Sequence, residues 1–104
     1  MRTLSPAEFQ ALAASGAVVL DVRLPEELAI AALPGAVVNI PLNDLPDRIG
    51  DLNPNEPIAV LCHHGVRSER AARFLERSGF SDVSHLGGGI DAWSQQIDES
   101  VPRY

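Results

Sequence analysis

The stretch VLCHHGVRSERAARFLERSGF, residues 60–80, decides the fold because a short loop joins an apolar run to a helical pattern. The run IAVL at 58–61 is apolar without alternation, as in a strand covered on both faces. The pattern after the loop predicts a helix over 68–78 that ends at Gly79. Cys62 lies between the two, so we expect it at the carboxyl edge of a parallel sheet, where open α/β folds bind ligands.

The rest of the chain repeats this alternation of strands and helices. Ser5-Pro6-Ala7-Glu8 combines an N-cap, a proline at the first helical position and a glutamate three residues after the cap. A helical segment over 42–52 is expected to be interrupted by Pro46. Strands separated by helices indicate right-handed crossovers, so we predict an α/β fold with a mainly parallel sheet and helices on both faces. The remaining predicted elements are helices over 6–15, 24–29 and 90–96 and strands over 17–22, 37–40 and 83–86.

Length, charge and cysteine content narrow the class of protein. The 104 residues suit a single domain, 1–104, and the net charge of -6 disfavours nucleic acid and anionic membranes as partners. No apolar run has the length of a signal sequence or a membrane span, so we expect a cytoplasmic protein. The only cysteine, Cys62, cannot form an internal disulfide. Any covalent chemistry at this residue must therefore end on a partner molecule.

The surroundings of Cys62 favour its thiolate form. Gly65 allows the loop to turn so that successive N–H groups converge on one anion, and a helix N-terminus follows directly. Arg67 adds a permanent positive charge. These features predict a reactive nucleophile. The other interpretation is that Cys62 is a buried small apolar residue that ends the strand, because free cysteines are among the most buried residues.

Arginines are concentrated in this part of the chain. The sequence has no lysine, and residues 62–79 carry a net charge of +2 in a protein whose total is -6. The helical spacing of Arg73 and Arg77 is typical of a solvated face with intrahelical glutamate partners, whereas Arg67 lies beside the loop and is assigned to function. The four arginines of the segment are Arg67, Arg70, Arg73 and Arg77.

Two further features of the sequence have more than one interpretation. His63 and His64 could act as a base, or as metal ligands together with Cys62 or His85. Adjacent side chains diverge and no metal-type spacing recurs, so we predict no metal site and interpret the pair as loop residues that add partial positive charge. The glycine run 87–89 lacks the spacing of a dinucleotide-binding motif and predicts a close approach of two backbone segments.

Four stretches together resemble the rhodanese-like, or thiosulfate sulfurtransferase, domain. They occur in the family's order and span nearly the whole chain: LDVRLPEEL (20–28), LPGAVVNIPL (33–42), VLCHHGVRS (60–68) and HLGGGIDAW (85–93). The resemblance implies a five-stranded, mainly parallel sheet with helices on both faces, and no cofactor.

The resemblance also implies the chemistry and its residues. Cys62 is the expected catalytic nucleophile, which takes a sulfur atom from a donor such as thiosulfate, becomes a persulfide and passes the sulfur to cyanide or a thiol. Asp21 and Arg23 are expected to support the pocket by pairing. The implied partners are a small anionic sulfur donor and a thiol acceptor, either a small thiol or a thioredoxin-like protein. The implied substrate-binding residues are His63, His64, Gly65, Val66, Arg67 and Ser68.

The chain departs from the family pattern in two places, and two other functions stay open. Many relatives have arginine after the cysteine, where this chain has His63, and Gly-His where it has Ala31-Ala32-Leu33. One cation fewer makes thiosulfate a less obvious donor. A cysteine phosphatase or arsenate reductase would use a similar loop, but those families have C-x5-R where Cys62 to Arg67 is C-x4-R. A persulfide carrier or binding module that serves a partner protein is the other alternative.

Overall fold

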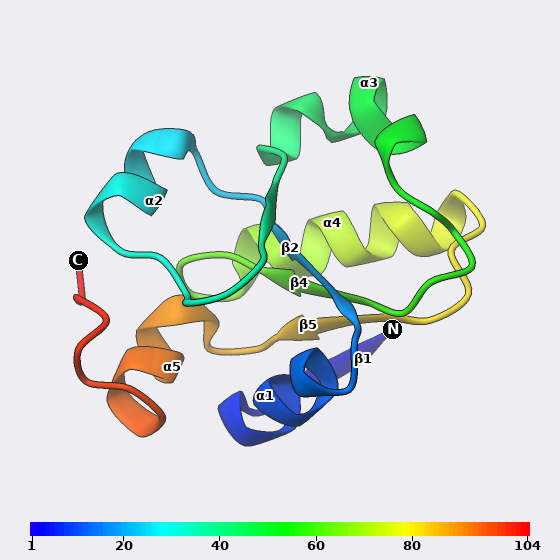
Figure 1. Ribbon diagram of the computed structural model, residues 1–104. Helices are drawn as coiled ribbons and strands as arrows, with labels where there is room; N and C mark the ends of the chain where they lie inside the picture. Colours follow the sequence, from blue (N-terminus) through cyan, green and yellow to red (C-terminus); the bar gives the residue numbers. More distant parts are fainter.

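A computed structural model describes all residues, 1–104. Five strands form one sheet in the order β1-β5-β4-β2-β3, and every neighbouring pair is parallel (Figure 1). The predicted fold class is therefore confirmed, with a sheet that is entirely parallel. The strands are β1 (Arg2–Leu4), β2 (Val18–Asp21), β3 (Val38–Asn39), β4 (Ile58–Leu61) and β5 (Val83–Leu86).

Helices cover both faces of this sheet. In Figure 1, α1 and α5 lie on one face and α3 and α4 on the other. The first helix begins at the predicted capping box, in which the Ser5 hydroxyl accepts from the Glu8 N–H and the Glu8 carboxylate accepts from the Ser5 N–H. None of the helices is long and apolar enough to cross a membrane. The helices are α1 (Pro6–Ala14), α2 (Pro25–Ile30), α3 (Leu45–Arg48), α4 (Val66–Arg77) and α5 (Gly89–Gln96), with 3₁₀ turns at Leu42–Asp44 and Ile49–Asp51.

The central position of β4 in the sheet explains why its sequence is apolar at every position. Successive side chains of a strand point to opposite faces, and both faces of this one are covered. Ile58, Val60 and Cys62 belong to the core cluster under α4, whereas Ala59 and Leu61 belong to the cluster under α1 and α5. The alternation continues past the last residue of the strand, so Cys62 is placed on the α4 side.

The strand order places a switch point between β2 and β4. The connection through α2 leads from β2 outward to β3, whereas the connection through α4 leads from β4 in the opposite direction to β5. The two connections separate at the carboxyl ends of these adjacent strands, which is where open α/β sheets form ligand sites. Cys62 follows β4 directly and therefore lies at this point.

Three details of the predicted elements need correction. The fourth helix begins at Val66 rather than 68, because Gly65 adopts a left-handed conformation and serves as its N-cap without any side-chain hydrogen bond. Pro46 does not interrupt a helix but lies in the first turn of α3, where its missing N–H costs nothing. Strand β1 was not predicted from the residues. It has three residues and pairs only with β5 at the edge of the sheet, so it offers little apolar pattern.

Candidate active site

The loop after β4 folds around the sulfur of Cys62. The N–H of Gly65 donates to Cys62 Sγ at 3.0 Å, and Cys62 is only 1% exposed. Gly65 has a φ of 109°, which side chains other than hydrogen rarely allow. A Cβ atom at this position would lie 2.0 Å from the Gly87 carbonyl oxygen. Glycine is thus required here both by backbone conformation and by space.

The N-terminus of α4 adds further donors to the same loop. The N–H groups of Val66, Arg67 and Ser68 lie in the first turn of the helix and make no backbone hydrogen bond. Unpaired amides and the helix dipole both favour a negative charge at this end of a helix. The loop and the helix together therefore form a cradle suited to an anionic sulfur.

The opposite side of the loop is tied to the start of α5. The carbonyl oxygens of Cys62 and His63 accept hydrogen bonds from the N–H groups of Ile90 and Asp91, at 2.9 and 3.2 Å. A Cβ atom at Gly89 would lie 2.2 Å from the His63 carbonyl oxygen. The predicted close backbone approach at residues 87–89 is thus confirmed.

A chain of polar side chains leads from the sulfur through the buried Ser68 and His85 to the exposed Thr3. The Oγ of Ser68 lies 3.4 Å from Cys62 Sγ and 2.9 Å from His85 Nδ1, and His85 Nε2 lies 3.1 Å from the Thr3 hydroxyl. Burial lowers the pKa of His85, so the ring is neutral near pH 7 and carries one N–H. The Ser68 hydroxyl donates to the Gly65 carbonyl at 3.2 Å and accepts from the Cys62 thiol, so it joins the sulfur, the loop and the His85 ring.

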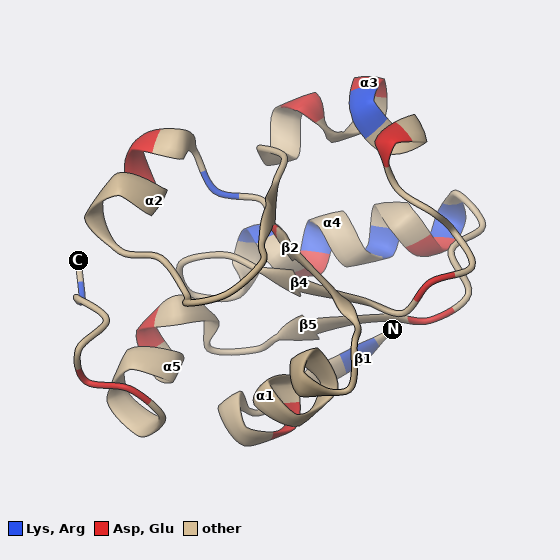
Figure 2. Cartoon of the chain, in the orientation of Figure 1, with Lys and Arg blue, Asp and Glu red and all other residues tan.

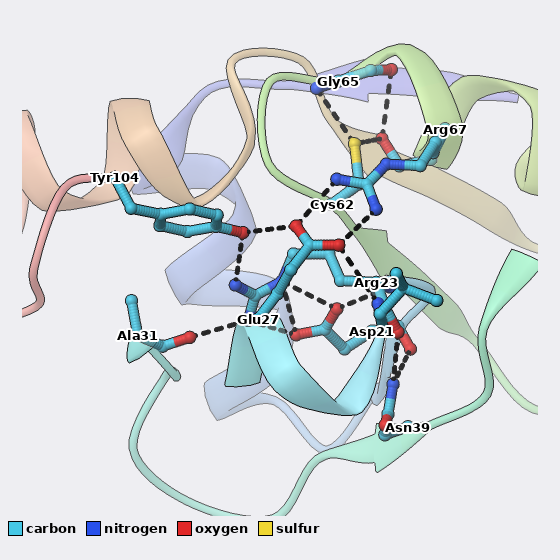
Figure 3. A network of polar contacts seen from close by, with 11 residues as sticks. Asp21, Arg23, Glu27, Ala31, Asn39, Cys62, Gly65, Arg67 and Tyr104 are labelled. Carbon is cyan, nitrogen blue, oxygen red and sulfur yellow. Dashed lines mark hydrogen bonds and ion pairs between the residues drawn. The ribbon is translucent and has the colours of Figure 1, made fainter. Parts of the chain in front are cut away.

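Arg67 does not contact the sulfur through a hydrogen bond but pairs with Glu27 of α2. Its two terminal nitrogens donate to the two carboxylate oxygens at 2.6 and 2.9 Å (Figure 3). This contact, with the hydrogen bond from Tyr104, lowers the pKa of Glu27 to about 2. The Glu27 contact likewise raises the pKa of Arg67, and the negative form of Cys62 contributes to the same shift. Arg67 therefore interacts electrostatically with Cys62, but its charge is largely balanced by Glu27.

A second ion pair lies deeper in the same network. Arg23 and Asp21 are 0% and 1% exposed, and Arg23 Nη2 donates to Asp21 Oδ2 at 2.7 Å. The guanidinium also donates to the Ala31 carbonyl at 2.9 Å and to the Tyr104 hydroxyl at 2.8 Å. That hydroxyl donates in turn to Glu27 at 2.6 Å. Tyr104 thus connects the two ion pairs, as Figure 3 shows.

His63 and His64 lie at the outer side of the loop. Their rings stack on each other, and the His63 ring also stacks on Tyr104 with centroids 3.8 Å apart. Burial, followed by the neighbouring His64, lowers the pKa of His63, so its ring is neutral at pH 7. Potential metal-ligand atoms of His63, His64 and Asp91 lie within 4.8 Å of one another, but the Asp91 oxygens already accept hydrogen bonds from Arg103 and Gln95.

The structure brings together most of the residues that the sequence marked as a site. Cys62, Gly65 and Ser68 are in direct contact, and Arg67 lies beside them through its ion pair. Val66 is the exception, because this residue is 65% exposed and contributes to the loop through its place at the first position of α4. Sequence reasoning missed Glu27 and Tyr104. They meet Arg67 and Arg23 only in the folded chain, and no local motif connects them.

The chain is similar in sequence to known proteins. Residues 5–96 match the family described as "Rhodanese-like domain". The chain belongs to the rhodanese-like family. A thiosulfate sulfurtransferase GlpE from Ectopseudomonas mendocina is 36% identical over 92 residues, which cover 88% of this chain and 84% of that protein. The putative sulfur carrier protein YrkF of Bacillus subtilis is 43% identical over 80 residues, which cover 77% of this chain and 43% of that protein.

Solved structures give the same result for this rhodanese-like chain. The crystal structure of a rhodanese-related protein from Thermoplasma volcanium superposes with a TM-score of 0.82 and 32% identity, covering 98% of this chain and 96% of that one. The chain spans less than half the length of some of its curated relatives.

Proposed function

We propose that this rhodanese-like domain is a sulfurtransferase that carries sulfane sulfur as a persulfide on Cys62. The observation that carries the proposal is the N–H of Gly65 donating to Cys62 Sγ at 3.0 Å, at the N-terminus of α4. A persulfide is an anion that needs several donors at fixed positions, and the free amides of the α4 first turn supply them. The relatives named thiosulfate sulfurtransferase support the same chemistry.

The reaction proceeds in two displacements at sulfur. The Cys62 thiolate attacks the sulfane sulfur of a donor, forming a new S–S bond while the donor's own bond to that sulfur breaks and its electron pair leaves with the remainder of the donor. With thiosulfate the leaving group is sulfite. An acceptor thiolate or cyanide then attacks the outer sulfur and regenerates the Cys62 thiolate. The chain has one cysteine, so a second molecule must remove the sulfur.

Each predicted site residue has a place in this scheme. Gly65 and the backbone of Val66 and Ser68 would hold the persulfide, and Arg67, paired with Glu27, would lie beside the incoming donor. His63 and His64 would form the outer wall of the site. The buried pair of Asp21 and Arg23 would hold the Glu27 and Tyr104 contacts in place. The proposed scheme uses no cofactor. The proposed acceptor is a small thiol or a thioredoxin-like protein, and the proposed location is the cytoplasm.

A carrier function is the second candidate, and the 43% identity to a putative sulfur carrier protein favours it. A carrier would form the same persulfide but release it only to a dedicated partner protein. Release to free cyanide at a catalytic rate would decide for the enzyme. A phosphatase has less support, because four residues rather than five separate Cys62 from Arg67 and the smaller loop suits a single sulfur atom.

Intact mass measurement tests the proposal directly. Wild-type protein treated with a sulfane-sulfur donor should gain the mass of one sulfur atom, and a thiol reductant or cyanide should remove it. Cys62→Ser should gain nothing while keeping the wild-type circular dichroism spectrum, because serine preserves the size of the buried side chain. Sulfur uptake by the variant, or rapid hydrolysis of an aryl phosphate by the wild-type protein without any sulfur uptake, would overturn the proposal.

A further inference from the structure

The cations around the mouth of the active site are already paired with carboxylates. Arg67 and Glu27 form a two-point ion pair, so the positive charge nearest to the loop is balanced by a neighbour with a fixed position. The Glu27 carboxylate cannot easily turn away, because its oxygens also accept hydrogen bonds from the Tyr104 hydroxyl and the Leu24 N–H. With a pKa of about 2, Glu27 stays ionised at every pH at which the protein would work.

The other cations do not replace the charge of Arg67. Arg23 is buried and paired with Asp21, and Arg103 is paired with Asp91. Figure 2 shows basic and acidic residues interleaved along α4. Among the arginines of this helix only Arg70 and Arg77 have no ion-pair partner, and both are exposed and lie beyond its first turn. A dianion that reaches the loop therefore meets amide dipoles but no free side-chain cation in contact with it.

The surface beside Arg67 is apolar instead. A hollow of about 190 Å³ lies next to this side chain, and five of its six lining residues are uncharged. Leu24, on the rim of this hollow, is 50% exposed, and Val66 at the start of α4 is 65% exposed. Aliphatic carbon that covers these side chains is stabilised by the hydrophobic effect, whereas a charged sulfonate group is not. The lining residues are Val22, Leu24, Pro41, Leu42, Asn43 and Arg67.

We infer that Glu27 is a specificity-determining residue, which neutralises Arg67 so that the site prefers an organic persulfide, R–S–SH with an aliphatic R group, to the thiosulfate dianion. This inference rests on the proposed function. The Cys62 thiolate attacks the outer sulfur of R–S–SH, the Cys62–S bond forms, and the R–S to SH bond breaks with its electron pair leaving on R–S⁻. The transferred sulfur keeps its oxidation state, so no oxidant or reductant is needed, and its proton is then released to solvent to leave the anionic Cys62 persulfide. The R group occupies the apolar hollow.

The test compares donors on the same protein rather than activities of different proteins. The rate of Cys62 persulfide formation is measured by intact mass with thiosulfate, with propyl persulfide, and with the persulfide of a capped Gly-Cys-Gly peptide. The wild-type protein should react faster with both organic persulfides than with thiosulfate. A faster rate for the peptide than for propyl persulfide would point to a donor carried on a protein, and the reverse order to a small-molecule donor.

Glu27→Gln then tests the role of the carboxylate. Removing its charge frees the charge of Arg67, so the ratio of the thiosulfate rate to the persulfide rate should rise about tenfold. Tyr104→Phe, which removes the hydroxyl that donates to Glu27, should shift the same ratio in the same direction by a smaller factor. Glu69→Gln is the matched control, because Glu69 pairs with Arg73 on the exposed side of α4, and it should leave the ratio unchanged.

The possible failures are distinguishable. If no donor loads sulfur onto wild-type Cys62, the proposed function is wrong and this inference falls with it. If wild-type protein loads sulfur from thiosulfate at least as fast as from the organic persulfides, or if Glu27→Gln folds and changes the ratio no more than Glu69→Gln does, the sulfurtransferase function stands and the role assigned to Glu27 is wrong. Should Glu27→Gln fail to fold, the same criterion applies to Tyr104→Phe.

Discussion

Two arginines of α4 each pair with a glutamate, yet the two ion pairs serve different purposes. Arg67 and Glu27 are 40 positions apart, meet through two hydrogen bonds, and are 34% and 16% exposed. Arg73 and Glu69 lie one turn apart on the same helix and are 59% and 46% exposed. The residue types are the same. Burial and tertiary position, rather than the chemistry of the side chains, therefore decide whether an ion pair affects the active site or only the stability of its helix.

The ion pair of Arg23 and Asp21 is fully buried, and breaking it should give the largest loss in the free energy of unfolding. Asp21→Asn leaves the guanidinium of Arg23 charged and without its counter-ion in the core, which should destabilise the protein by about 3 to 5 kcal/mol. Urea denaturation would measure the loss. Asp51→Asn breaks an exposed Asp–Arg pair with Arg48 and should cost less than about 0.5 kcal/mol. Equal losses of unfolding free energy in the two variants would contradict the expectation that buried ion pairs matter more than exposed ones.

Arg67 should show the next largest effect, on reactivity. Arg67→Ala removes the cation beside the loop and leaves the Glu27 carboxylate without its main partner, so the rate constant of sulfur loading should fall by a factor equivalent to about 1.5 to 3 kcal/mol. Stopped-flow measurement of sulfur loading gives this rate constant. Identical behaviour of Arg67→Ala and Arg73→Ala would remove Arg67 from the site.

Acid should remove the contribution of the Glu27 carboxylate to the stability of the protein. Its pKa falls from an ordinary 4.5 to about 2 on folding, so the carboxylate binds a proton more weakly in the folded state. The stabilisation is therefore complete above about pH 4.5 and is lost as the pH falls toward 2. The melting temperature of Glu27→Gln should be lower than that of the wild type by the equivalent of about 1 kcal/mol near neutral pH. This gap should close between pH 4.5 and 2, and a gap independent of pH would contradict the assignment.

Arg73 should show the smallest effect. Arg73→Ala breaks an exposed pair of the i,i+4 type, which is worth about 0.3 to 0.5 kcal/mol on a helix, and it leaves the loop untouched. Sulfur loading should stay within about twofold of the wild-type rate, which corresponds to about 0.4 kcal/mol. A larger loss of rate in this variant would mean that the outer face of α4 takes part in donor binding.

The sequence predicted the cysteine loop better than its surroundings because the loop is local. The loop lies in a short segment in which a strand is followed by Cys62, Gly65 and a helix. Each of these has a distinct sequence signal. The start of α4 was misplaced because Gly65 caps the helix through its backbone conformation, and no capping side chain marks the position. Glu27 and Tyr104 could not be predicted as neighbours, since their contact joins residues 77 positions apart and depends on the packed fold.

The attachment of the loop to α5 fixes the direction of its peptide groups. In a trans peptide the carbonyl and the following N–H point in opposite directions. Because the carbonyls of Cys62 and His63 are bound by α5, the N–H groups of His63 and His64 point the other way, and the main chain leading to Gly65 is fixed. The Gly65 N–H that donates to Cys62 Sγ is thus positioned before any ligand arrives, and loading or unloading of the sulfur should require almost no rearrangement of the main chain. The shape of the site is therefore maintained in part by α5, although the hydrogen bonds of the sulfur are made with Gly65 and Ser68.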